Sequence, residues 1–322
     1  MALPTHAVTG DILKRIESQL GPAASDLGAF ARLLYADCPP DGLASYRAQC
    51  LAQFARDAFE FLGQKPRGRH RIRARRATFS SDGDAEPLTV LEIVNDDMPF
   101  LVDSVMGEIH ARGLDVRLAL HPIMKIRRAP SGVLEGILGP GDSNWGDGSQ
   151  ESFIAVLLDP LSECVARETA ESLSALLDGV RLAVTDWQTM VARLDRAIGA
   201  LESRPPPIPP GLLSESLAFC RWMRDGQFTF LGLREYRLEG DAETGDLIPV
   251  AGSALGVLRD PTLHVLSRRR ARLGMTPEIW SYLSAPQPLI ITKSNIFSRI
   301  HRRGHMDYIG LKTYRSDGPL AG

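Results

Sequence analysis

The stretch LTVLEIVNDDMPFLVDS, residues Leu88 to Ser104, predicts a buried strand, a polar loop and the beginning of a helix. Its first seven residues are mostly apolar and rich in β-branched side chains, which is typical of a strand covered on one face and flanked by neighbours. Pro99 is expected to start the helix, because the first helical turn does not need the backbone N–H that proline lacks. The stretch therefore predicts a strand–loop–helix unit.

The residues that follow extend this unit into a small domain. Residues 115–128 alternate in polarity as an antiparallel strand does, and a Gly/Pro/Ser-rich loop is expected over residues 129–150. Residues 152–158 (SFIAVLL) predict a third strand, Asp159-Pro160 opens a second helix, and residues 180–184 (VRLAV) predict a last strand. The predicted order is βαββαβ, a ferredoxin-like antiparallel sheet with two helices on one face.

The whole chain is predicted to be α+β with four parts. Apolar residues at helical spacing make residues 1–80 a helical N-terminal segment that ends in a basic linker, and residues 86–188 are the ferredoxin-like domain. Residues 189–210 are a helix followed by a linker, because the five prolines of RPPPIPP fit neither a helix nor a central strand. Residues 211–322 predict a second α+β module, which we expect to be truncated, since the turn-forming ending KTYRSDGPLAG follows a strand-like run directly.

The composition limits the classes of function. The 322 residues have a formal net charge of −2, which gives no general reason to expect nucleic acid or an anionic membrane as a partner. No apolar run is long enough to cross a bilayer, and the first residues do not resemble a secretory signal. The four cysteines are far apart and form no C-x-x-C pair, so we expect reduced thiols, a cytoplasmic location and no metal site.

The densest basic run is KPRGRHRIRARR, Lys65 to Arg76. Nucleic-acid binding would explain it, but no aromatic residues are interleaved with the arginines as a platform for base stacking. We favour an exposed strand or linker whose arginines pair with acidic residues on neighbouring elements.

The first candidate site is the loop between the strand and the helix of the opening stretch. Free backbone N–H groups at a helix N-terminus suit an anionic group such as a carboxylate. Either aspartate could instead cap the helix, and both would repel a carboxylate unless they held the ammonium group of the same ligand. Two interpretations stay open, capping with dimer packing or a small-molecule site, and the residues concerned are Asn95, Asp96, Asp97, Met98, Pro99 and Phe100.

The second candidate site is a basic patch beside two predicted strands. It could receive an acidic ligand or an acidic face of another domain, or it could be a solvated edge. A metal ion between His301 and His305 is disfavoured, because the arginines between them repel a cation. The patch consists of Lys293, Arg299, His301, Arg302 and Arg303, with His305 next to them.

We find no catalytic motif in the sequence. The Gly-rich residues 136–148 fit neither a dinucleotide fingerprint nor a phosphate-binding loop, and a mobile hairpin loop is expected there. No nucleophile with a partnered base and no supported pair of carboxylates stands out. The sequence therefore predicts a non-catalytic stretch that binds no cofactor itself.

Several segments together resemble a known family. The segment Asp97–Leu101 resembles the Asp-x-Pro-Gly-Leu turn of ACT regulatory domains, which share the ferredoxin-like topology. The chain is also similar to the N-terminal regulatory region of the large bacterial NAD-specific glutamate dehydrogenases. The segments that carry this likeness, in the same order, are EIVNDDMPFLVDSV (92–105), LHPIMKIRR (120–128), ESFI (151–154), FTFLGLREY (228–236), IITKSN (290–295) and SRIHRRGHMDYIGLK (298–312).

The resemblance implies that the whole protein converts L-glutamate, NAD and water to 2-oxoglutarate, ammonia and NADH in a catalytic domain outside these residues. This stretch would be a regulatory and oligomerising region, with an ACT-like domain over residues 86–188 and a PAS-like or ACT-like second module. Its expected partners are the downstream catalytic domain, other subunits of a homo-oligomer and an amino-acid effector. The alternative is a stand-alone amino-acid-binding module. Phe100 replaces the glycine of ordinary ACT turns, and its ring is expected to cover the pocket, which favours a packing role.

Overall fold

The computed structural model describes residues 5–21, 26–80, 85–139, 146, 148–240, 246–263, 273–274 and 277–314. The chain divides into two compact units, residues 1–177 and 178–322. The division lies inside α6 (Glu163–Ser203), a single helix of 41 residues. None of the helices in the described residues is long and apolar enough to cross a membrane.

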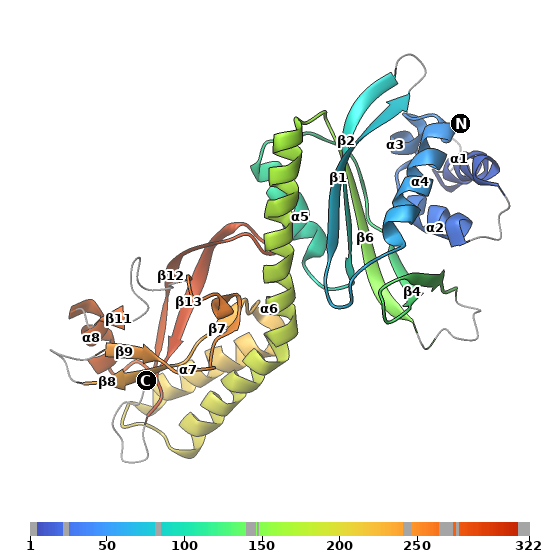
Figure 1. Ribbon diagram of the computed structural model, residues 1–322. Helices are drawn as coiled ribbons and strands as arrows, with labels where there is room; N and C mark the ends of the chain where they lie inside the picture. The colour runs from blue at the N-terminus through green and yellow to red at the C-terminus, as the bar shows by residue number, and fades with distance from the viewer. Residues whose placement is uncertain are drawn as a thin grey trace. The chain divides into compact units, whose positions relative to one another are not determined.

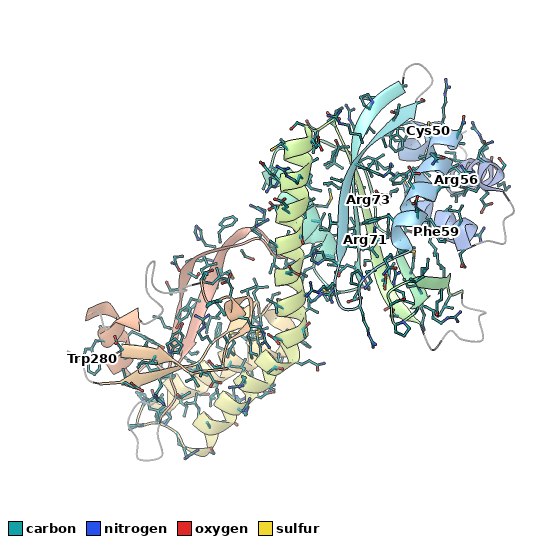
Figure 2. All side chains as sticks on the ribbon, in the orientation of Figure 1. Cys50, Arg56, Phe59, Arg71, Arg73 and Trp280 are labelled. Carbon is teal, nitrogen blue, oxygen red and sulfur yellow. The ribbon has the colours of Figure 1, made fainter. Side chains whose placement is uncertain are left out.

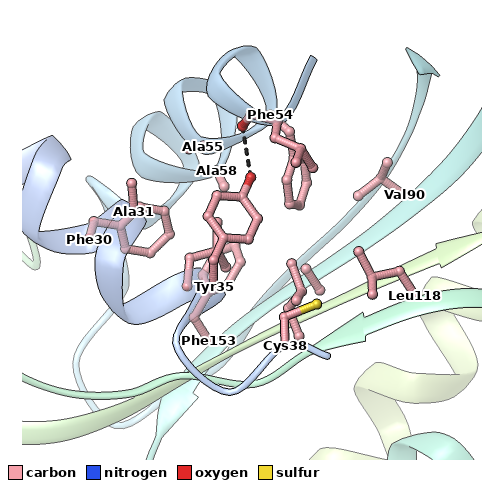
Figure 3. Close-up of a cluster of buried hydrophobic side chains, with 14 of the residues drawn as sticks. Phe30, Ala31, Tyr35, Cys38, Phe54, Ala55, Ala58, Val90, Leu118 and Phe153 are labelled. Atoms are coloured by element: carbon pink, nitrogen blue, oxygen red, sulfur yellow. Dashed lines mark hydrogen bonds between the residues drawn. The ribbon is translucent and has the colours of Figure 1, made fainter. Parts of the chain in front are cut away.

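The first unit begins with four helices, which agrees with the helical N-terminal segment that the sequence predicts. They are α1 (Thr5–Leu20), α2 (Asp26–Tyr35), α3 (Pro40–Ala44) and α4 (Ala48–Leu62). Their apolar sides share one core with one face of a sheet, and Figure 3 shows part of it. Tyr35 is fully buried there, and its hydroxyl donates to the carbonyl of Leu51 at 2.7 Å. The helical segment is therefore part of a mixed core.

The sheet of the first unit is entirely antiparallel. Its order is β1-β2-β6-β4-β5, and β3 also pairs with β6. The strands are β1 (Arg71–Ser80), β2 (Ala85–Asp96), β3 (Val116–Leu120), β4 (Ile123–Arg128), β5 (Leu134–Ile137) and β6 (Ser149–Leu158).

Helices cover both faces of this sheet. Helices α1 to α4 lie on one side, and α5 (Leu101–Ala111) with the first part of α6 lies on the other (Figure 1). Eight consecutive residues of β2, from Leu88 to Asn95, are buried for this reason, and so are residues 151–158 of β6. The expectation of a strand covered on one face only is wrong, because a continuous apolar run belongs to a strand between two layers.

The prediction of a strand over residues 180–184 is also wrong. These residues lie within α6, where the buried residues Leu173, Leu176, Leu177, Val180 and Ala183 follow helical spacing. A five-residue apolar run fits a strand or a buried helix turn equally well, so periodicity could not decide. The place beside β2 is taken by β1, which comes from the basic segment. From β1 onward, the observed order is therefore ββαββββα and not βαββαβ.

Two further expectations in this unit need correction. The single strand predicted over residues 115–128 is divided at His121-Pro122 into β3 and β4. There the carbonyl of Pro122 accepts a hydrogen bond from the backbone N–H of Phe153, so the chain stays attached to β6 without a regular strand. The loop predicted over residues 129–150 contains β5 and the first residues of β6. The strand predicted over residues 152–158 is confirmed.

The second unit contains the rest of α6 and several smaller elements. Residues of α6 and α7 (Pro210–Trp222) share a core that includes Leu194, Ile198, Leu217 and Cys220, and RPPPIPP connects the two helices. The remaining elements are η2 (Met223–Gln227), β7 (Gly232–Leu233), β8 (Tyr236–Glu239), β9 (Asp246–Pro249), β10 (Leu255–Gly256), η3 (Val257–Arg259), β11 (Leu273–Gly274), α8 (Pro277–Ser284), β12 (Leu289–Ser298) and β13 (Gly304–Leu311).

These small elements form three sheets. Strands β12 and β13 are a hairpin, β8, β9 and β11 form a three-stranded sheet, and β7 pairs with β10. Residues 212–226 and 276–283 have helical periodicity in the sequence, and residues 288–296 and 306–314 are strand-like. Helices α7 and α8 and strands β12 and β13 confirm these predictions. The apolar run QFTFLGLREYRL, residues 227–238, also predicts one strand, but the structure has two short strands there, β7 and β8, which belong to different sheets.

Candidate ligand-binding site

The loop after β2 differs from its prediction at the helix start. Helix α5 begins at Leu101, so Pro99 precedes the helix and Phe100 is its N-cap residue. Phe100 has a φ of +72°, a left-handed conformation that suits glycine. The side chain of Phe100 makes no cap hydrogen bond to α5. The first turn is closed by the backbone N–H of Ser104, which donates to the carbonyl of Phe100 at 3.1 Å.

Asp96 belongs to a cluster of charges on the sheet face that α1 to α4 cover. Its carboxylate lies 2.6 Å from Lys65 Nζ, and Lys65 also contacts Glu151 at 3.3 Å. Lys65 and Glu151 are each only 2% exposed. Arg128 completes the cluster, because its guanidinium donates to both carboxylate oxygens of Glu151 at 2.9 Å. Mutual pairing therefore compensates these buried charges, and Asp96 contributes to the structure.

Asp97 has a different environment, below the start of α5. Ser152 Oγ donates to the Asp97 carboxylate at 2.6 Å, and His121 Nε2 lies 3.1 Å from the same Oγ. Burial lowers the pKa of His121, although the charge of Asp97 opposes this shift. Neighbouring strand residues point to opposite faces, so Ser152 lies opposite Asn95 while Glu151 lies opposite Asp96.

Serine, histidine and aspartate here do not form a nucleophilic triad. In a triad the serine gives its hydroxyl proton to the histidine, and the carboxylate orients the histidine. In this cluster the Ser152 proton goes to Asp97, and Ser152 is completely buried. The arrangement can hold the loop against β6, but it cannot attack a substrate.

The second half of the basic run, residues 71–76, lies in β1, and two of its arginines pair with acidic residues as we favoured. Arg73 and Arg75 both donate to Glu92, at 2.5 and 2.9 Å. Glu92 is completely buried on β2, next to β1. Figure 2 shows Arg71 and Arg73 beside α4, where both guanidinium groups lie 4.4 Å from the centre of the Phe61 ring. The strand is partly buried, which differs from the exposed strand we expected.

The predicted basic patch lies on β12, on β13 and in the turn between them. Lys293 Nζ lies 2.5 Å from the carboxylate of Asp307, so a neighbour on β13 offsets its charge. The Arg303 guanidinium lies 5.6 Å from the centre of the Phe297 ring, and His305 also packs on that ring. Arg299, His301 and Arg302 lie at the turn, where His301 has a φ of +61°. Within the described residues no group of His, Cys, Asp and Glu could hold a metal ion.

Comparison with known proteins identifies the first unit. The family described as "Glutamate dehydrogenase, ACT1 domain" matches residues 30–173. Most of the first unit is therefore similar to the glutamate dehydrogenase ACT1 domain. The match begins within α2 and includes α3, α4 and β1, so it extends beyond the predicted strand–loop–helix unit on its N-terminal side, while α1 lies outside it.

Similarity to three curated relatives extends beyond the ACT1 domain. The NAD-specific glutamate dehydrogenase of Halomonas elongata is 31% identical over 319 residues, which cover 97% of this chain and 20% of the relative. That of Pseudomonas aeruginosa is 26% identical over 99% of this chain and 20% of the relative. That of Mycobacterium tuberculosis is 27% identical over 61% of this chain and 12% of the relative. The predicted resemblance is confirmed, and the chain spans about a fifth of the length of the first two relatives.

Sequence reasoning missed the residues that surround the loop of residues 95–100, which we call the ACT1 loop. Glu151 and Ser152 stand at the beginning of a predicted strand, where strand alternation puts them on opposite faces. His121 and Arg128 lay within a predicted strand, and Lys65 was one member of a long basic run. The sequence offered no means of seeing that these distant residues meet around residues 95–97.

Proposed function

We propose that this chain is a regulatory region of an NAD-dependent glutamate dehydrogenase. The whole protein would convert L-glutamate, NAD and water to 2-oxoglutarate, ammonia and NADH. The observation that supports this most is the similarity to NAD-specific glutamate dehydrogenases over 97% of the chain, combined with the ACT1 match. The chain spans a fifth of these relatives, which leaves room for catalysis in other residues of a longer protein.

The geometry of the ACT1 loop supports a structural role over a catalytic one. Asp96 and Glu151 are paired with Lys65 and Arg128, and the Ser152 proton is donated to Asp97. The sequence has no dinucleotide fingerprint, so we place NAD binding outside these residues. The loop would thus hold α5 and β6 in place, and an amino-acid effector there would have to displace or bypass the ring of Phe100.

The proposal includes the partners and the location. We infer that the region contacts the catalytic part of its own protein and other subunits of a homo-oligomer in the cytoplasm. The paired carboxylates and arginines in the first unit limit how many of its charges are open to a ligand. Packing against other protein surfaces is the role that such an internally compensated domain performs most readily.

The test compares two proteins in one assay. The natural gene product, from its own start codon to its own stop codon, and the 322-residue chain are each assayed for glutamate-dependent formation of NADH. We expect activity in the gene product and none in the 322-residue chain. Turnover by the 322-residue chain would overturn the proposal, and so would a gene product that folds but does not reduce NAD with glutamate.

A further inference from the structure

The second unit contains a cavity of about 560 Å³. Its lining comes from α6, α7, α8, the short strands β7 to β9 and the hairpin of β12 and β13. All of its lining residues lie between positions 193 and 313, so it belongs to this unit alone. Its volume is within the range of about 300–1,000 Å³ that is usual for small-molecule sites.

Aromatic and aliphatic side chains make up most of the lining. Phe228 and Phe230 contact each other edge to face, with ring centres 5.4 Å apart. Three tyrosines, Tyr236, Tyr282 and Tyr308, add further ring surface. Such a lining favours a ligand with an aromatic or branched apolar body, because burying that body removes apolar surface from water.

The acidic side chains on the cavity wall already have cationic partners. Glu235 is paired with Arg193, and Asp307 with Lys293. The guanidinium of Arg234 donates to the backbone carbonyls of Leu258, Asp260 and Leu263. These charges are therefore compensated without a ligand.

Lys312 is different. It follows β13 directly, lines the cavity and is only 2% exposed. Its ammonium donates to the carbonyl of Ala285 at 2.6 Å and lies 4.6 Å from the centre of the Tyr282 ring. Among the residues that the structure describes, no carboxylate lies within ion-pair distance of it. One carbonyl and one ring face compensate a buried ammonium only in part.

We propose that this cavity binds a monocarboxylate with an aromatic or branched apolar body, and that the Lys312 ammonium pairs with its carboxylate. The apolar body lies against the rings of the cavity wall. A ligand that carries a cationic group beside its carboxylate is disfavoured, because Glu235 and Asp307 are already paired with cationic side chains. The proposal concerns binding by this unit alone, so it can fail or succeed independently of glutamate dehydrogenase activity.

The electrostatics of Lys312 agree with this geometry. Burial lowers the pKa of the Lys312 ammonium to about 8. A bound carboxylate would compensate the charge and raise the pKa again, so protonation of Lys312 and ligand binding favour each other.

The test is calorimetric titration of the 322-residue chain with 3-phenylpropanoate at pH 7. We expect binding with one site per chain, and binding at least about tenfold weaker for the neutral analogue 3-phenylpropan-1-ol. Lys312→Met should weaken 3-phenylpropanoate binding by at least about tenfold, whereas Lys14→Met should not change it, because Lys14 is 80% exposed in the first unit. No binding by the wild-type chain, or equal binding by Lys312→Met, would overturn the proposal.

A second pair of variants places the ligand within the cavity. Ala197 lines the cavity, whereas Ala200 is exposed on the same helix and does not. Ala197→Phe should abolish binding by filling the space, and Ala200→Phe should leave it unchanged. If Lys312→Met does not fold, the affinities of the wild-type chain for 3-phenylpropanoate and 3-phenylpropan-1-ol show whether the site requires a carboxylate. Equal affinities for the acid and the alcohol would overturn the pairing of Lys312 with a carboxylate, and tighter binding of L-phenylalanine than of 3-phenylpropanoate would overturn the exclusion of a cationic group.

Discussion

Asp96 and Glu151 are directly opposite each other on β2 and β6, and the ammonium group of Lys65 contacts both carboxylates. Like charges in opposite positions of an antiparallel pair destabilise a sheet unless a cation compensates them. Lys65 follows α4, so this contact ties the helical layer to the middle of the sheet. The cluster therefore makes a quantitative prediction about stability.

Lys65→Met should lower the free energy of unfolding by about 3 kcal/mol, since it leaves buried carboxylates with fewer counter-charges. Urea denaturation followed by circular dichroism measures this change. Lys14→Met is the matched control, because Lys14 is exposed and its substitution should change stability by less than about 0.5 kcal/mol. Similar unfolding midpoints for the two variants would contradict the structural role of Lys65.

Gly132 and Gly68 allow a separate test of the chain segments around this cluster. Both have a positive φ, but an added Cβ at Gly132 would lie 2.1 Å from the carbonyl oxygen of Lys65, whereas Gly68 has open space. Gly68→Ala should cost about 1 kcal/mol from backbone strain alone. Gly132→Ala should cost at least about 2 kcal/mol more, through overpacking. Denaturation of both variants under one set of conditions measures the difference, and equal losses would refute the close approach.

Phe100 provides a test of backbone conformation in the loop. A left-handed residue other than glycine costs about 1 kcal/mol, and a β-branched side chain tolerates that conformation poorly. Phe100→Gly should therefore change stability by less than about 1 kcal/mol, because relief of strain offsets the lost contacts of the ring. Phe100→Val should be less stable than Phe100→Gly by about 1–2 kcal/mol. Thermal unfolding compares them, and a Val variant as stable as the Gly variant would contradict the positive φ.

Lys312 predicts a specific dependence of stability on pH. Its pKa is lowered from 10.5 to about 8, so between these values the unfolded chain holds a proton that the folded chain has released. Stability from this group is therefore lowest below pH 8 and increases as the pH rises from 8 to 10.5. The difference in unfolding free energy between the wild type and Lys312→Met, measured at several pH values, should change in the wild type's favour over this window. A constant difference would contradict the desolvated ammonium.

The affinity for a ligand should also depend on the protonation of Lys312, but it should decrease with rising pH, whereas stability increases. Only the protonated Lys312 attracts a carboxylate, so affinity for 3-phenylpropanoate should decrease above pH 8 by up to about tenfold per pH unit. Three neighbouring groups on the wall have pKa values above this range and stay neutral in it. Burial raises the pKa of Cys220 to about 11 and of Tyr308 to about 12, and Tyr282 is shifted in the same direction. Titration at pH 7, 8 and 9 measures the effect, and an affinity independent of pH would exclude Lys312 as the counter-ion.

Local patterns predicted much of the fold. The strand at Leu88–Val94 was predictable, because its run of apolar and β-branched residues is long enough to exclude a single turn of helix. Residues 180–184 have a similar composition but lie in α6, where the residues before and after them determine their conformation. Secondary structure was thus predictable where the pattern extended over many residues, and its prediction failed where the pattern covered only five.

The candidate site was less predictable, because contacts distant in sequence determine it. Asp96 and Asp97 are adjacent in sequence, yet they point to opposite faces and have different partners, Lys65 and Ser152. The arginines of the basic run could be expected to pair with acids, but the sequence alone did not show that two of them share Glu92. Lys312 belongs to no recognisable sequence motif, and its role as a candidate binding residue follows only from its place in the wall of the cavity.

The position of β1 at the edge of the sheet has a practical consequence. Residues 71–80 pair with β2 along its whole outer side, so the strand from the basic run closes an edge that the predicted domain of residues 86–188 would leave open. An uncovered strand with unpaired N–H and C=O groups is a template for pairing with another chain. A fragment trimmed to residues 86–188 should therefore aggregate faster than one that begins at residue 71 and retains β1.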